Sequence, residues 1–146
     1  MLDRTEFARW REAADGARRS AELQATSQLF NWACFLAEQG AQLGIKGLLH
    51  GIGGGAWGHD LVTLGGTLGE AMAEPSPGEV DAALRRLSRH YIPARYPDAH
   101  PAGSPGMHYG REDAEQAIHD LRTVLDHVDT LWIALSAAAE GAEDGS

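Results

Sequence analysis

Two side chains between residues 92 and 110 could act together on a phosphate group. Arg95 and His100 flank the tetrapeptide Tyr-Pro-Asp-Ala. A guanidinium stays charged and can contact two phosphate oxygens at once, whereas an imidazole exchanges protons near neutral pH. The pair could therefore act on a phosphate ester, with His100 transferring protons and Arg95 stabilising the negative charge that develops.

The same two residues also allow a noncatalytic interpretation. Arg95 could brace its loop by bonding to Asp98 or to carbonyls at a helix end, with His100 merely exposed. The spacing alone does not decide between the two interpretations, because short motifs recur by chance. It occurs twice more in the chain, at Arg85 with His90 and at Arg122 with His127.

Cationic side chains are concentrated just before this pair. Four of the twelve lysines and arginines fall within eleven residues: Arg85, Arg86, Arg89 and Arg95. They form a local patch that could receive a phosphate, and Tyr91 and Tyr96 beside it could stack on a base. The alternative is an ordinary solvated helix face, with the tyrosines packing a loop onto the rest of the chain. The formal net charge of -9 excludes a general nucleic-acid coat, so any contact with a polyanion must be local.

Neither a metal nor a cofactor is expected. The chain has seven histidines, yet His119 and His127 lack an intervening ligand at the spacing of a zinc helix. The glycines from Gly53 to Gly55 should form a turn that caps a helix. A phosphate-cradling loop is the alternative, although the Lys-Ser/Thr of a P-loop is missing.

Helices must position these side chains, because apolar residues recur at spacings of three and four and no strand-like alternation is sustained. The spacing predicts a first helix from about Asp3, a second over residues 30–49, and a third that Asp60 caps. The capping-box pattern Ser76-Pro77-Gly78-Glu79 predicts a fourth helix, which Pro93 stops. The fold class is therefore all-α.

Residues 92–110 contain four prolines and three glycines, which predicts a long irregular loop. The last helix should hold its apolar stripe for about six turns, from Ala114 to Leu135. We expect residues 1–140 to form one domain and residues 141–146 to be a disordered acidic tail. The charged, amphipathic start lacks the apolar stretch of a signal peptide or spanning helix, so we expect a cytoplasmic protein without membrane contact.

Three segments, taken in order, resemble the HEPN family. The run from Ala33 to Leu49 is similar to the family's Gln-Ala-Ala-Glu-x-x-x-Lys-Ala-Leu-Leu run, with Gln39 and Lys46 in register. Gly58-His-Asp-Leu follows. The segment Tyr91-Ile-Pro-Ala-Arg-Tyr-Pro-Asp then resembles the Tyr-x-x-x-Arg-Tyr-Pro-Asp signature of one prokaryotic branch. The chain departs from the family at Gln42, where a glutamate is usual, and at two glycines that replace alanines, Gly44 and Gly47.

The resemblance implies an antiparallel, up-and-down bundle of four to five helices that pairs into homodimers. It also implies nucleotide or RNA handling beside a small nucleotidyltransferase, as in a toxin-antitoxin module. In some branches it implies metal-independent RNA cleavage by an arginine followed by four to six residues and a histidine, a spacing that Arg95 and His100 match. On this basis the candidate nucleotide- or phosphate-binding residues are Lys46, Arg85, Arg89, Tyr91, Arg95, Tyr96 and Asp98.

The two functions implied are a noncatalytic module that binds nucleotide or RNA and assists the nucleotidyltransferase, and an endoribonuclease toxin. The first is favoured. Tyr96 follows the arginine where nuclease members often carry a short polar residue, and Pro97 and Pro101 keep Arg95 and His100 off one regular helix.

Overall fold

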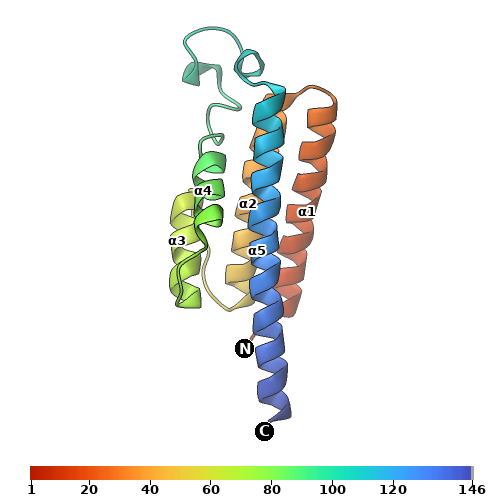
Figure 1. Ribbon diagram of the computed structural model, residues 1–146, viewed down its shortest axis with the longest axis vertical. Coiled ribbons are helices and arrows are strands. Elements are labelled where there is room, and N and C mark those ends of the chain that lie inside the picture. The colour runs from red at the N-terminus through yellow and green to blue at the C-terminus, as the bar shows by residue number, and fades with distance from the viewer. Residues whose placement is uncertain (146) are drawn as a thin grey trace.

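The computed structural model describes residues 1–145, which form a helical bundle without a β-strand (Figure 1). The elements in chain order are α1 (Arg4–Thr26), α2 (Phe30–Gly51), α3 (Leu61–Met72), α4 (Gly78–Ser88), the 3-10 helices η1 (Pro97–Ala99) and η2 (Pro105–His108), and α5 (Arg111–Asp144). The long helices α1, α2 and α5 lie side by side, and the shorter α3 and α4 form a pair on one flank. The all-α prediction is confirmed.

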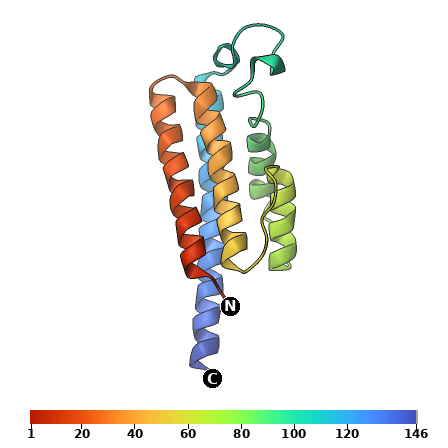
Figure 2. The same ribbon diagram turned by 180° about the vertical axis from the view of Figure 1, so that it is seen from behind.

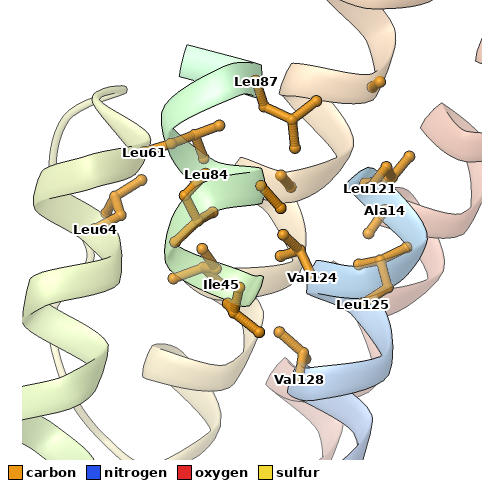
Figure 3. Close-up of a cluster of buried hydrophobic side chains, with 14 of the residues drawn as sticks. Ala14, Ile45, Leu61, Leu64, Leu84, Leu87, Leu121, Val124, Leu125 and Val128 are labelled. Carbon is orange, nitrogen blue, oxygen red and sulfur yellow. The ribbon is translucent and has the colours of Figure 1, made fainter. Parts of the chain in front are cut away.

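The core lies between α2 and its neighbours, because α2 packs against every other α-helix. Side chains of all five helices meet there: Ala14, Ile45, Leu64, Leu84 and Val124 (Figure 3). Burying such apolar side chains stabilises the bundle by about 1.5–3 kcal/mol for each large residue. The predicted apolar stripes of the second and last helices are therefore the faces that the fold buries.

Two glycines of α2 allow its neighbours to approach closely. A Cβ atom at Gly44 would lie 2.6 Å from Leu125 Cδ2, and one at Gly47 would lie 2.7 Å from Trp10 Cβ. Alanines at these positions would collide with the neighbouring side chains. The glycines that depart from the family pattern are therefore explained by the large residues packed against them.

Two helices begin where the sequence predicted them to begin, and a third does not. Asp3 accepts from the amide of Glu6 at 2.9 Å, and Asp60 accepts from the amide of Thr63 at 3.3 Å, as expected of N-caps. The capping box predicted at Ser76 is wrong: α4 begins at Gly78, and its N-cap is Pro77, without a side-chain cap. The carbonyl of Pro77 accepts the first helical bonds, so Ser76 lies one residue too early.

The last helix extends further than the sequence indicated. α5 continues to Asp144, whereas we expected a disordered tail from residue 141. Alanine has the highest helix propensity, and the alanines at 137–139 and at 142 favour continuation of the helix over an irregular chain. The final residue of the expected tail, Ser146, lies outside the described residues.

The irregular segment between α4 and α5 covers one end of the bundle, opposite the two chain ends (Figure 1). The side-chain amide of Asn31, at the start of α2, donates to the carbonyl of Ala94 at 3.0 Å. Ala94 and Pro105 are buried, which anchors the segment on the bundle. We call residues 89–110 the end loop. No helix within residues 1–145 is long and apolar enough to cross a membrane.

Candidate functional site

Arg95 is held in the end loop by one hydrogen bond and three aromatic rings. Its Nε donates to the carbonyl of Tyr91 at 2.8 Å. Its Cζ lies 4.4 Å from the ring centroid of Phe35, 4.6 Å from that of Tyr91 and 4.9 Å from that of Tyr96. A cation over a ring face is attracted to it, so the rings fix the guanidinium without neutralising it. Within residues 1–145 the terminal nitrogens of Arg95 have no hydrogen-bond partner and remain available to an anion.

A buried carboxyl group lies close enough to Arg95 to feel its charge. Glu38, on α2, has an exposed fraction of 0% and accepts from the side-chain amides of Gln39, at 2.8 Å, and of Gln42. Burial raises the pKa of Glu38, against the two amides and the positive charges of His59 and Arg95, which lower it. The electrostatic potential that Glu38 creates at Arg95 therefore depends on whether the carboxyl group is protonated.

The sequence analysis missed Glu38, although its position carried a signal. It lies four residues after Cys34 and seven before Ile45, both in the apolar stripe of α2. A carboxylate at such a position must either be protonated or have partners, because an unpaired buried charge is costly. This pattern is typical of a functional group rather than a packing group.

A shallow groove of about 310 Å³ lies near Arg95. It is lined by His59 and Asp60 just before α3, by Ser88 at the end of α4, and by residues 91–93 of the end loop. The ring of His59 stacks on that of Tyr91, with centroids 4.1 Å apart and planes 12° from parallel. Ser88 Oγ donates to Asp60 at 3.2 Å across the two helices. Tyr91 belongs both to this groove and to the rings around Arg95, so the groove and the guanidinium lie on either side of one shared residue.

His100 does not meet Arg95. Its Nε2 lies 2.7 Å from the carbonyl of Pro93, so this nitrogen carries the proton. Its ring stacks on that of His108 at 4.2 Å, and His108 Nε2 in turn donates to the carbonyl of Ala102 at 2.6 Å. Within residues 1–145 no hydrogen bond, ion pair or ring contact joins His100 to Arg95, and Asp98 does not bond to Arg95 either.

The arginine cluster of the sequence is divided between different surfaces. Arg86 forms two hydrogen bonds of 2.8 Å to the buried Asp120 of α5. Arg85 lines a separate groove between α3 and α4, and Arg89 is exposed. Only Arg95, with Tyr91 and Tyr96, forms the site described above. Lys46 lies on α2 eight residues beyond Glu38, about 12 Å further along the helix.

The two other arginine-histidine pairs have separate contacts. Arg122 bonds to Glu22 of α1. The Nδ1 atom of His90 lies 3.1 Å from the hydroxyl of Tyr109, and burial lowers the pKa of His90. Within the described chain, no three His, Cys, Asp or Glu side chains gather closely enough to hold a metal ion.

Comparison with known proteins defines the class. The HEPN domain model matches residues 7–131, so the chain belongs to the HEPN family. This confirms the resemblance carried by the three sequence segments. Comparison with curated proteins finds no match.

Solved structures agree with this assignment. The chain is similar to TT1696 from Thermus thermophilus, with 37% identity and a TM-score of 0.81 over 85% of this chain and 96% of the other. An archaeal HEPN homologue matches at 26% identity and a TM-score of 0.72, over 86% and 96%. A HEPN domain protein from Thermotoga maritima matches at 25% identity and a TM-score of 0.67, over 85% and 97%.

Proposed function

We propose that the chain is a noncatalytic HEPN module that binds a nucleotide or RNA through a phosphate at Arg95. The observation that carries the proposal is the enclosure of this guanidinium by Phe35, Tyr91 and Tyr96, with its terminal nitrogens left available. A guanidinium held in this way loses little conformational freedom when it forms a fork to two phosphate oxygens.

Aromatic rings beside Arg95 can receive the base attached to such a phosphate. The side chain of Tyr96 is half exposed, and the His59–Tyr91 stack borders the adjoining groove. Stacking on rings tolerates any base, so we expect binding with little base preference. Asp60, on the rim of the groove, can accept a hydrogen bond from a ribose hydroxyl.

The position of His100 supports the noncatalytic alternative over endoribonuclease activity. A general acid or base must reach the proton that it transfers, and the Nε2 of His100 is directed at the Pro93 carbonyl. Cleavage would require this bond and the stack on His108 to break. We therefore assign phosphate binding to Arg95 and a loop-bracing role to His100.

Family membership supports a proposal about the biological setting of this binding. We propose that the chain forms a homodimer and assists a small nucleotidyltransferase, in the manner of a toxin-antitoxin module. Nucleotide binding at Arg95 would then present a substrate or product to that partner.

Binding can be tested with a fluorescent oligoribonucleotide, with AMP and ATP as competitors. Arg95→Ala should weaken binding at least tenfold, because charged hydrogen bonds contribute about 1.5–3 kcal/mol. Arg95→Lys should give an intermediate loss, since it keeps the charge but not the fork. The control is Arg19→Ala, an exposed arginine on α1 that changes the net charge equally. Equal affinity of the Arg95→Ala and Arg19→Ala variants would contradict the proposal.

The endoribonuclease alternative needs a separate experiment. The protein is incubated with RNA in EDTA, alongside Arg95→Ala and His100→Ala. We expect no cleavage by any of the three proteins. Cleavage that survives the chelator and disappears in both variants would replace the noncatalytic proposal with catalysis by Arg95 and His100.

A further inference from the structure

A second groove, separate from the Arg95 site, runs between α3 and α4. Its volume is about 650 Å³, and its floor contains Leu84 of α4 and the glycines of α3. The two helices lie side by side on the flank of the bundle that is remote from α1 (Figure 2). Val62 and Gly66 of α3, together with Ala73 at its C-cap, are exposed and form one wall of the groove.

One glycine in this wall has no role inside the chain. A Cβ at Gly65 would lie 2.6 Å from Leu84 Cδ1, and one at Gly69 would lie 3.3 Å from the carbonyl of Glu74, so both glycines relieve internal contacts. A Cβ at Gly66 would meet nothing within 4 Å. A helical glycine costs about 1 kcal/mol relative to alanine. This cost brings no packing benefit within the chain, and a bare helix surface lets a second helix approach closely.

The charge around the groove restricts what can lie in it. Glu70, Glu74 and Asp81 line it against a single arginine, Arg85. The negative charge of the groove also acts on the neighbouring His127. Burial lowers the pKa of His127, and the carboxylates of Glu74, Asp81 and Glu79 partly oppose this shift. A second copy of this acidic chain would add charge of the same sign, particularly through the carboxylates at the end of its α5. A basic segment complements the groove.

We propose that the α3–α4 groove docks an amphipathic helix of a partner protein, with small apolar residues facing Gly66 and lysines or arginines facing Glu70 and Glu74. The 12 residues of α3 span about 18 Å, room for roughly three turns of a partner helix. A helix laid in an apolar groove is a recurring mode of peptide recognition. The groove is independent of nucleotide binding at Arg95.

The probe is a labelled helical peptide of about 15 residues, long enough to lie along α3, with alanine and leucine on one face and lysine on the other. A matched peptide carries glutamate in place of lysine. Fluorescence anisotropy with the full chain should show binding of the lysine peptide, weakened by added salt, and no binding of the glutamate peptide. Failure of the lysine peptide to bind, or equal binding of both peptides, would overturn the proposal.

Two substitutions locate the peptide. Gly66→Leu places a large side chain in the groove from a position whose Cβ would meet nothing within 4 Å, and Gly16→Leu makes the same change at an exposed glycine of α1 whose Cβ also meets nothing within 4 Å. Gly66→Leu should lower the affinity for the lysine peptide at least tenfold, and Gly16→Leu should leave this affinity unchanged.

Glu70→Lys should also lower the affinity for the lysine peptide. Glu12→Lys makes an equal charge change on α1 and should leave this affinity unchanged. Binding that neither Gly66→Leu nor Glu70→Lys weakens would place the peptide elsewhere and overturn the proposal. Light scattering on Gly66→Leu is a further check. A loss of dimer mass would make the groove an interface between copies of this chain and would also overturn it.

Discussion

Glu38 and Arg95 are the two residues whose charges determine the character of the site. Glu38 is fully buried, and burial raises its pKa. A protonated Glu38 leaves the positive charge of Arg95 uncompensated, whereas an ionised Glu38 opposes the arrival of an anion. The proton on Glu38 and a phosphate at Arg95 therefore favour one another.

Substituting Glu38→Gln tests this picture through stability. A raised pKa means that the folded chain holds the proton more tightly than the unfolded chain, so stability falls as pH rises through the carboxyl range. Glutamine cannot ionise, and the amides of Gln39 and Gln42 can rotate to bond to it. We expect the variant to have a higher free energy of unfolding than the wild type above neutral pH.

The advantage of Glu38→Gln should shrink as pH falls toward the ordinary glutamate pKa of 4.5 and stay small below it, where the carboxyl is protonated in both the folded and the unfolded chain. Urea unfolding across the pH range measures it. A variant that is less stable at every pH would indicate that Arg95 and His59 stabilise the carboxylate by more than its burial costs.

Part of this site was predictable from the sequence. Tyr91, Arg95 and Tyr96 lie within six residues, so any compact loop brings them together. Phe35 and His59 come from other helices and loops, and their approach depends on how α2 and α3 pack. The orientation of the His100 ring depends on which backbone carbonyl nearby lacks another hydrogen-bond donor. Residue spacing does not specify that carbonyl.

At the scale of helices, one ion pair fastens α4 to α5. The guanidinium of Arg86 forms a two-bond fork to Asp120, which has an exposed fraction of 1%, whereas the arginine side chain is 43% exposed. Gln116 also donates to Asp120, at 3.0 Å. Since α4 and α5 flank the end loop, this fork joins the two helices that carry the ends of the loop.

Removing Arg86 and removing Asp120 should lower the free energy of unfolding by different amounts. Arg86→Ala leaves a buried carboxylate with Gln116 alone, and breaking such a pair costs about 3 kcal/mol. Asp120→Ala leaves a half-exposed guanidinium that water can solvate, and we expect a loss of about 1 kcal/mol. Chemical denaturation of both variants measures the difference. Equal losses would contradict the role assigned to burial of the carboxylate.

Helices were more predictable from the sequence than their ends. Apolar residues at spacings of three and four indicated all five helices, because burial of one face is the main source of helix stability in proteins. The start of α4 depends on whether Pro77 or Ser76 occupies the cap, and both suit a helix start. The end of α5 depends on alanines that have no buried face to identify them.

For the molecule as a whole, the homodimer proposed above predicts a particular mass in solution. We expect light scattering after size exclusion to give twice the mass of one chain at micromolar concentration and above. Apolar side chains left exposed in the described chain, such as Leu23, Trp57 and Ile133, are consistent with surfaces that a partner covers. A mass of one chain at every concentration would contradict the expectation.

The global arrangement could be predicted only through the family resemblance. Periodicity indicates which face of each helix is buried but not which neighbour covers it, so neither the pairing of α3 with α4 nor their groove follows from the sequence. The placement of the end loop across the start of α2 depends on long-range contacts, such as the hydrogen bond from Asn31 to Ala94 and the contact of Arg95 with Phe35.

Both chain ends emerge at the pole of the bundle opposite the end loop (Figure 1). The 34 residues of α5 separate the two poles by about 50 Å. An experimenter can therefore anchor the protein to a sensor surface through either terminus and leave the end loop, where we propose that nucleotide binds, open to the sample. By the same geometry, an enzyme fused beyond α5 would need a tether of about that length to reach Arg95.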